Sequence, residues 1–130
     1  MTLAVEDTAP GVSRKTVLVV EDEVGLRFLI AMVLREDAGL TVVEAQNADE
    51  ALAVLRSGVT VSVMFTDVRM PGSMSGTELI RRVRADYPDI KVMMTSGNLT
   101  QDERIPNVPL FTKPYDIDQV RAHIVTMIEG

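Results

Sequence analysis

Five short runs of β-branched and apolar residues recur along this chain, and stretches with helical periodicity separate them. Most of the runs are continuously apolar rather than alternating, which is typical of strands covered on both faces. Strands that alternate with helices in this way form a doubly wound α/β fold with right-handed crossovers. We therefore predict one parallel sheet built from Thr16 to Val20, Thr41 to Glu44, Val61 to Thr66, Ile90 to Thr95 and Leu110 to Thr112.

Local start and stop signals mark the helices between these strands. Asn47 followed by Glu50 resembles a capping box, and the helical pattern after it ends before Gly58. Asp116 with Gln119 starts the last helix in the same way. The predicted helices run from about Val24 to Asp37, after Asn47, after Gly76 and after Asp116.

Length and composition limit the classes of protein to which this chain can belong. A chain of 130 residues with 46% hydrophobic residues has the size of one domain and can bury a core. No stretch has the length and purity of a membrane span, and a chain without cysteine has no disulfide, thiolate nucleophile or zinc ribbon. We expect a loose tail over residues 1–14, without signal-peptide character, and one cytoplasmic domain over residues 15–130.

The net charge of −6 argues against DNA as a partner, because an acidic protein repels the phosphate backbone. Arg81, Arg82 and Arg84 form a local basic cluster. Three such residues on a helix are more often a solvated face than a binding patch.

Chemically reactive side chains gather where the predicted strands end. Glu21 and Asp22 follow the first strand, and Asp67 follows the third. Each could by itself be a helix-start or turn residue. If the strand order is 2-1-3-4-5, however, all three meet at the switch point between the first and third strands. Three carboxylates there repel one another unless a cation lies among them, and an oxygen-rich site suits magnesium.

Two further strand ends supply groups that suit a phosphoryl oxygen. Lys113 precedes Pro114 at the end of the fifth strand, so its ammonium should point at the same crevice rather than only at solvent. Ser96 at the end of the fourth strand supplies a hydroxyl, unless it only terminates the strand, and Gly97 lets the backbone approach closely.

At these positions the chain resembles the receiver domain of bacterial two-component response regulators, over about residues 15 to 129. The resemblance implies that Asp67 is the phosphoacceptor, with Ser96, Lys113 and the backbone of Val68 and Gly97 at the phosphoryl group. It also implies a Mg²⁺ (or Mn²⁺) site formed by Asp22, Asp67, Glu21 through water, and the Arg69 backbone carbonyl. The Lys113-Pro114 bond is expected to be cis. The matched motifs are Leu18-Val19-Val20-Glu21-Asp22-Glu23, Asp67-Val68-Arg69-Met70-Pro71 with Gly76, Thr95-Ser96-Gly97 and Lys113-Pro114.

The function that this resemblance implies is signalling rather than enzymatic turnover. A sensor histidine kinase or a histidine phosphotransfer protein would donate a phosphoryl group to Asp67, and the domain would at most catalyse its own phosphorylation and dephosphorylation. Because the chain ends at Gly130, directly after the last helix, we expect a stand-alone receiver. Its output would be a contact with a downstream protein or a phosphate sink, with no DNA or membrane partner and with a homodimer possible.

Three features depart from the usual receiver pattern. The stretch from Met70 to Gly76 holds one extra residue, so this loop should have its own shape. Pro106 and Pro109 crowd the segment 97–109, so we expect a fourth helix that is a single turn near residues 100–104 or is absent. Leu110 replaces the usual aromatic residue, and its neighbour Phe111 should point to the opposite face of the sheet.

Two other interpretations compete with a phosphoacceptor function. One is a receiver-like binding or dimerisation module that phosphorylation does not regulate. The other is a hydrolase with an aspartyl nucleophile, but such enzymes usually carry a second acid two residues after the nucleophile, where this chain has Arg69. Phosphorylation by a small acyl-phosphate donor would distinguish them.

Overall fold

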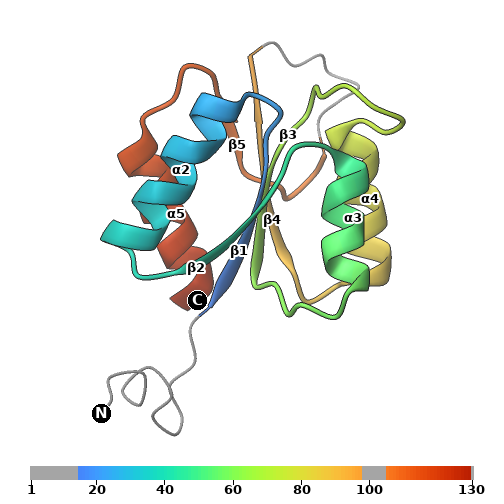
Figure 1. The fold of residues 1–130 in the computed structure, drawn as a ribbon, viewed down its shortest axis with the longest axis horizontal. Coiled ribbons are helices and arrows are strands. Elements are labelled where there is room, and N and C mark those ends of the chain that lie inside the picture. Colours follow the sequence, from blue (N-terminus) through green and yellow to red (C-terminus); the bar gives the residue numbers. More distant parts are fainter. Residues whose placement is uncertain (1–14, 98–104, 130) are drawn as a thin grey trace, which may run out of the picture.

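The computed structural model describes residues 15–97 and 105–129. The predicted doubly wound parallel sheet is confirmed, with the strand order β2-β1-β3-β4-β5 (Figure 1). Its strands are β1 (Thr16–Val20), β2 (Thr41–Ala45), β3 (Val63–Asp67), β4 (Lys91–Ser96) and β5 (Leu110–Thr112).

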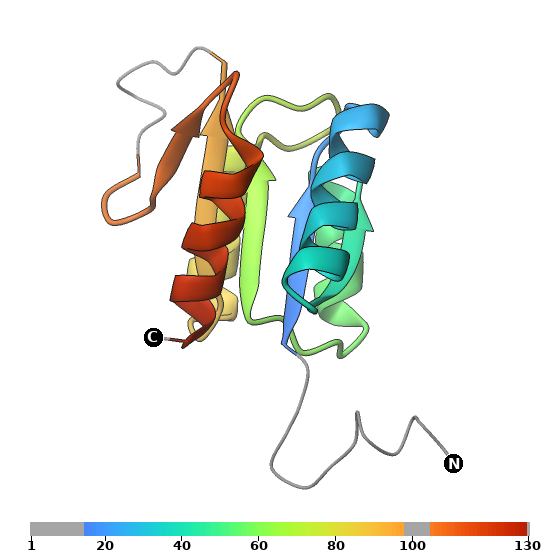
Figure 2. The ribbon, with the colours of Figure 1, turned by 90° about the vertical axis from the view of Figure 1, so that its left-hand side faces the viewer.

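Within residues 15–97 and 105–129, two helices cover each face of the sheet, which gives three layers. Figures 1 and 2 show α2 and α5 on one face and α3 and α4 on the other. This arrangement explains why the strands are apolar on both sides. The helices are α2 (Val24–Asp37), α3 (Ala48–Arg56), α4 (Gly76–Asp86) and α5 (Ile117–Glu129).

Most boundaries of the helices and strands agree with those predicted from the sequence, and the differences are small. The strands β1 and β5 and the helix α2 have their predicted bounds, whereas β3 and β4 begin and end one or two residues later than expected. The first and last residues of a strand are poorly specified by local pattern, because pairing with neighbouring strands determines where the strand begins and ends. Both the tail 1–14 and the predicted helical turn near 100–104 lie outside the described residues. Residues 105–109 form no helix, but a turn at Pro106 and Asn107.

Alternation along the strands divides the core into two clusters. Leu18 and Val20 of β1 face the α3 and α4 side, whereas Val17 and Val19 face α2 and α5, and all four are at most 1% exposed. The same alternation separates the two residues of β5 that the sequence singled out. Leu110 packs with the first cluster and Phe111 with the second, which confirms their predicted opposite orientation.

Polar side chains cap the N-terminal ends of three helices, α3, α4 and α5. Asn47 accepts a hydrogen bond from the Glu50 N–H at 2.8 Å, as predicted, but Glu50 reaches back to the Gln46 N–H instead of completing the box at Asn47. Ser75 caps α4 by accepting from the Glu78 N–H at 3.2 Å. Asp116 caps α5 by accepting from the Asp118 N–H at 2.8 Å, whereas the Gln119 N–H donates to the Asp116 carbonyl at 3.1 Å and not to its side chain.

Candidate phosphoacceptor and metal site

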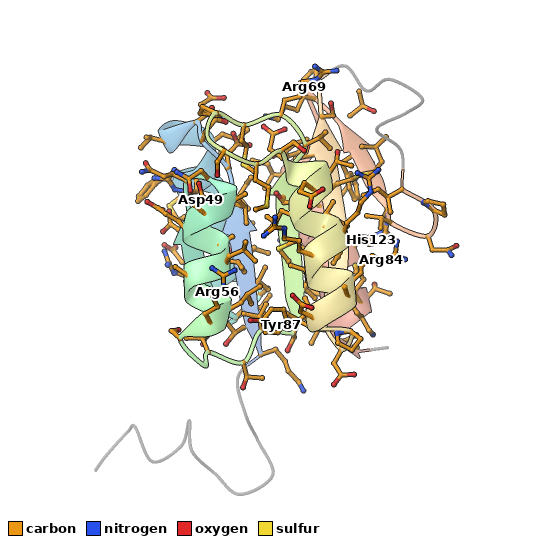
Figure 3. All side chains as sticks on the ribbon, turned by 90° about the vertical axis from the view of Figure 1, so that its right-hand side faces the viewer. Asp49, Arg56, Arg69, Arg84, Tyr87 and His123 are labelled. Atoms are coloured by element: carbon orange, nitrogen blue, oxygen red, sulfur yellow. The ribbon has the colours of Figure 1, made fainter. Side chains whose placement is uncertain are left out.

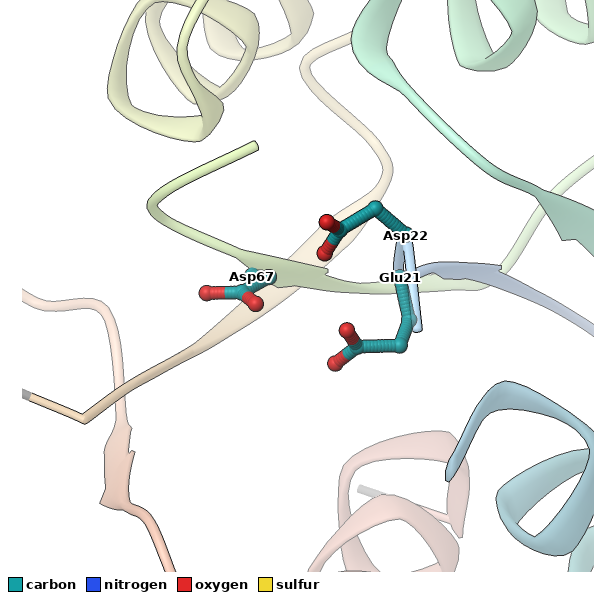
Figure 4. Close-up of side chains that lie close together, drawn as sticks. All are labelled: Glu21, Asp22 and Asp67. Atoms are coloured by element: carbon teal, nitrogen blue, oxygen red, sulfur yellow. The ribbon is translucent and has the colours of Figure 1, made fainter. Parts of the chain in front are cut away.

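Three carboxylates from two strand ends converge at the edge of the sheet. Glu21, Asp22 and Asp67 each offer one oxygen, and these oxygens lie within 4.8 Å of one another (Figure 4). Glu21 and Asp67 are only 2% and 4% exposed, whereas Asp22 is exposed to solvent. The cluster thus has a buried floor and one open side.

Strand pairing is what brings these residues together. β1 lies between β2 and β3, and its last residue, Val20, is in register with Thr66. Glu21 and Asp22 therefore leave the sheet beside Asp67, the last residue of β3. This is the switch point at which the chain turns from one side of the sheet to the other, the usual place for ligands in such folds.

Lys113 supplies the positive charge of the site. Its Nζ donates a hydrogen bond to Asp67 Oδ2 at 2.8 Å and forms an ion pair with Glu21 Oε1 at 3.2 Å. A backbone bond from the Lys113 N–H to the Ser96 carbonyl at 2.9 Å fixes the end of β5 beside β4, and the Lys113-Pro114 bond is cis, as predicted. The sequence placed Lys113 at this crevice but did not reveal its contact with Glu21.

Burial and charge shift the protonation equilibria of the site in physically consistent directions. Burial raises the pKa of Glu21, and the neighbouring charge of Asp67 raises it further against the lowering effects of the Glu23 N–H and Lys113. Burial alone would lower the pKa of Lys113, but the hydrogen bond and charge of Asp67, together with Glu21, leave it raised. The site is therefore short of positive charge, and Lys113 stays protonated.

Within the described part of the chain, Glu21 Oε1 also lacks a hydrogen-bond donor. This buried oxygen accepts no hydrogen bond of normal geometry from the described residues, and Lys113 approaches it only as an ion-pair partner. The other carboxylate oxygen, Oε2, accepts from the Glu23 N–H at 3.0 Å. A buried oxygen without a donor is costly, and a hydrated cation would satisfy it.

These donors fit a hard divalent cation. All three side chains present carboxylate oxygens, which Mg²⁺ prefers, and the open side at Asp22 leaves room for the waters that this ion retains. The chain therefore has a candidate magnesium site at Glu21, Asp22 and Asp67.

The backbone around Asp67 shows which amides face its carboxylate. The Arg69 N–H donates to Asp67 Oδ1 at 3.2 Å, and Arg69 lies at the end of the sheet where the strands terminate (Figure 3). The Val68 N–H instead donates to the Thr95 carbonyl at 2.9 Å. A contact between the Val68 amide and a phosphoryl group stays a prediction. The structure shows in addition that the Arg69 amide faces the Asp67 carboxylate, whereas the sequence analysis gave Arg69 a role only through its carbonyl, as a metal ligand.

Ser96 is 1% exposed and ends β4 next to Asp67, because Thr95 is the register partner of Asp67. Gly97 follows at the exposed strand end, and a Cβ there would meet no atom within 4 Å. Both residues therefore lie at the end of β4 beside Asp67, and their roles at a phosphoryl group stay predictions.

The loop with the extra residue is held against α3 and against the site. Ser73 Oγ lies 3.0 and 2.9 Å from the two carboxylate oxygens of Asp49, and Gly72 has a φ of 119°, which favours glycine. At the end of the loop, the Gly76 N–H donates to the Val68 carbonyl at 2.8 Å. These contacts fix the loop in this structure, while a shape different from that of other receivers stays a prediction.

Tyr115 is a neighbour of the site that the sequence analysis missed. Its ring packs edge-on against Phe65 with 6.0 Å between centroids, and its hydroxyl is buried without a hydrogen-bond partner in the described residues. Burial raises the pKa of the Tyr115 phenol, and the charges of Glu21, Asp67 and Glu23 raise it further. The available signal was its position directly after Lys113-Pro114.

Replacing Glu21 by Gln should stabilise the protein in the absence of metal and weaken its response to magnesium. Because the raised pKa of Glu21 shows that folding disfavours its ionised form, we expect the variant to have a higher Tm than the wild type at pH 7. The folded form binds this proton more tightly, so the gain should disappear as the pH falls below the ordinary value of 4.5.

Thermal unfolding with EDTA and with Mg²⁺ measures both effects. Glu36→Gln, at an exposed position on α2, is the matched control and should behave like the wild type. A Glu21→Gln protein that is less stable than wild type without metal would show that the ion pair with Lys113 outweighs burial and repulsion.

Comparison with known proteins decides the family. The family model of the response regulator receiver domain matches residues 17–124. The chain belongs to the receiver domain family. Receiver domains are signalling modules of two-component systems, so the acidic cluster lies in a fold that serves phosphoryl signalling.

Similar proteins include both long kinases and short receivers. The chain is 35% identical over 123 residues to the sensor kinase CckA of Brucella abortus, covering 88% of this chain and 12% of that protein. It is 30% identical over 111 residues to the chemotaxis protein CheY of Pseudomonas aeruginosa, covering 84% and 88% of the two chains. A solved receiver domain from the hybrid histidine kinase CckA superposes with a TM-score of 0.74 at 31% identity, covering 87% of this chain and 98% of that one.

Several matched proteins are much longer than this receiver domain. The chain spans 12% of CckA and 52% of the phosphate regulon regulator PhoB of P. aeruginosa. Among residues 15–97 and 105–129, no helix is long and apolar enough to cross a membrane.

Proposed function

We propose that this receiver domain accepts a phosphoryl group from a phosphohistidine onto Asp67 in a magnesium-dependent reaction. The donor would be a sensor histidine kinase or a histidine phosphotransfer protein. The contact that supports this proposal most strongly is the 2.8 Å hydrogen bond from Lys113 Nζ to Asp67 Oδ2 inside a cluster of three carboxylates. A cation and a buried nucleophile on adjacent strand ends can bind and neutralise a phosphoryl group.

The chain's own residues account for most of the transfer. An Asp67 carboxylate oxygen attacks phosphorus in line, the phosphorus–nitrogen bond breaks, and the histidine ring leaves with its electron pair, while an acyl phosphate forms. Lys113 neutralises a phosphoryl oxygen, and Ser96 with the Val68 and Gly97 amides would donate to the others. The Arg69 amide, which faces Asp67, would add a further donor. The residues that would hold Mg²⁺ are Asp22 and Asp67, with Glu21 through water and the Arg69 carbonyl. Bound Mg²⁺ supplies further neutralisation of the phosphoryl oxygens, and Mn²⁺ would serve equally.

Incubation with acetyl phosphate and Mg²⁺, followed by intact-mass analysis, tests this function. We expect one added phosphoryl group per chain, and none when EDTA removes the divalent cation, because three carboxylates then repel the donor's phosphate. An unmodified protein under conditions that label a known receiver would favour the alternative function, a binding or dimerisation module that phosphorylation does not regulate.

Output by protein contact is the second part of the proposal. The net charge of −6 disfavours DNA, and a downstream protein or a phosphate sink suits an acidic, cytoplasmic receiver. A homodimer is one form such a contact can take. Phosphorylation would act through Ser96 at the end of β4 and through β5, where Leu110 replaces the aromatic switch, with a coupling of about 1–3 kcal/mol.

Beryllofluoride, which mimics the acyl phosphate, tests this coupling. Binding to captured partner proteins should differ between beryllofluoride-treated and untreated protein, and Ser96→Ala should reduce the difference. Equal binding in both states would show that phosphorylation does not gate the output, and full switching by the variant would remove the hydroxyl from the mechanism.

A further inference from the structure

A cavity lies at the opposite end of the sheet from Asp67. It has a volume of about 350 Å³, within the range of small-molecule sites. Its walls come from the C-terminal part of α4, the start of β4, the segment before β5, and α5. Arg84, which lines it, is far from Arg69 in Figure 3. The cavity is therefore separate from the phosphoacceptor site.

Two cations line this cavity without a carboxylate partner. Arg84 on α4 and Lys91 at the start of β4 both contribute to the wall, and neither has an acidic group within 4.0 Å in the described part of the chain. The nearby acids Asp86, Asp89 and Glu129 are all exposed. Arg84 and Lys91 are exposed as well, but among the described residues that line the cavity they are the two charged side chains, and no carboxylate lines it.

Both cations are held in place by backbone carbonyls and keep donors to spare. Arg84 Nη1 donates to the Pro106 carbonyl at 3.0 Å, and Lys91 Nζ donates to the Met127 carbonyl. A guanidinium has five N–H donors and an ammonium three, so most of them stay available. These contacts also have a plain structural role, because they hold the segment before β5 and the end of α5.

The cavity is also lined by apolar side chains and by one asparagine. Val92 is 6% exposed, and Val108 and Met127 are half-buried, so they offer an apolar floor. Asn107, at the rim, has a φ of 67° and an amide with no hydrogen bond to the described residues. Polar groups form the larger part of the lining and apolar side chains the smaller part, so the cavity suits a ligand whose charged group makes the main contacts.

The geometry points to this cavity as a binding site for a small organic anion, with a carboxylate or phosphate group at Arg84 and Lys91 and an apolar body on the floor. Such a ligand would neutralise two like charges and use their free donors. It would also contact Asn107 and Val108, which lead directly into β5. The inference does not depend on phosphorylation of Asp67.

Amide chemical shifts of the metal-free protein test the site with three probes. Benzoate and phenyl phosphate carry the two anionic groups on the same ring, and benzyl alcohol is their neutral counterpart. We expect both anions to shift the amides of Val92, Asn107 and Val108, with a dissociation constant on the order of 1 mM for ligands of this size. The neutral probe should leave these amides unchanged.

Variants that remove one positive charge test whether the cavity recognises the anionic group of the ligand or only accommodates its ring. Lys91→Gln and Arg84→Gln keep an N–H for the backbone carbonyl but lose the charge, and each should weaken anion binding about tenfold. Arg81→Gln, on the same helix but outside the cavity wall, is the matched control and should bind like the wild type. Absence of shifts at the lining residues, equal shifts with benzyl alcohol, or unchanged affinity in both charge-removing variants would overturn the inference.

Discussion

Replacing Asp67 by Asn should abolish phosphorylation by acetyl phosphate while leaving the protein folded. The amide keeps the size of the carboxylate but is a poor nucleophile, so no acyl phosphate can form. The change also removes one of three converging negative charges, and Lys113 keeps its ion pair with Glu21 at 3.2 Å. Intact-mass analysis measures the label, and thermal unfolding confirms that the variant is folded.

Asp89→Asn is the matched control, because this exposed aspartate lies in the connection between α4 and β4, away from the site. It should accept the same label as the wild type. A fully labelled Asp67→Asn variant would move the phosphoacceptor to another residue and refute the assignment, even if the chain still responded to magnesium.

Replacing Gly76 by Ala should have the largest effect on stability. A Cβ at this position would lie 1.9 Å from the Asp67 carbonyl oxygen and 2.8 Å from the Asp67 carbonyl carbon and Val68 Cα. These are backbone atoms of the strand that carries the phosphoacceptor, so they cannot turn aside as a flexible side chain would. We expect a loss of about 3 kcal/mol or more in the free energy of unfolding, measured by urea denaturation.

Gly25→Ala is the control for this substitution. Gly25 lies in the first turn of α2, and a Cβ there would meet no atom within 4 Å. Alanine should therefore stabilise the helix by about 0.5–1 kcal/mol, because it restricts the unfolded chain and favours helix. A Gly76→Ala protein within 1 kcal/mol of wild type would mean that the start of α4 can move away from Asp67 at little cost.

Local pattern was sufficient for the helices and for most of the sheet. The bounds of α2 and β5 and the opposite faces of Leu110 and Phe111 follow from side-chain periodicity, which each segment carries within itself. Pattern was less reliable at the ends of β3 and β4, because hydrogen bonds to neighbouring strands determine where a strand stops.

The acidic site could be predicted for a topological reason. In a parallel sheet all carboxyl ends of the strands lie at one edge, so residues that follow different strands in the sequence become neighbours in space. This rule placed Glu21, Asp22, Asp67 and Lys113 together before any distance was known. It could not give the shape of the site, because the rule fixes the edge at which a residue lies and not the direction of its side chain.

The sequence by itself thus determined the parallel fold, the edge at which the acids, the serine and the lysine meet, and the residue types that suit a phosphoryl group and a cation. Only the tertiary structure decided the ion pair between Lys113 and Glu21, the packing of Tyr115 on Phe65, the close approach of Gly76 to Asp67, and the cationic cavity at Arg84 and Lys91. Each of these depends on the relative placement of segments that are distant in the chain. Such placement is set by packing of the whole core, about which local periodicity carries no information.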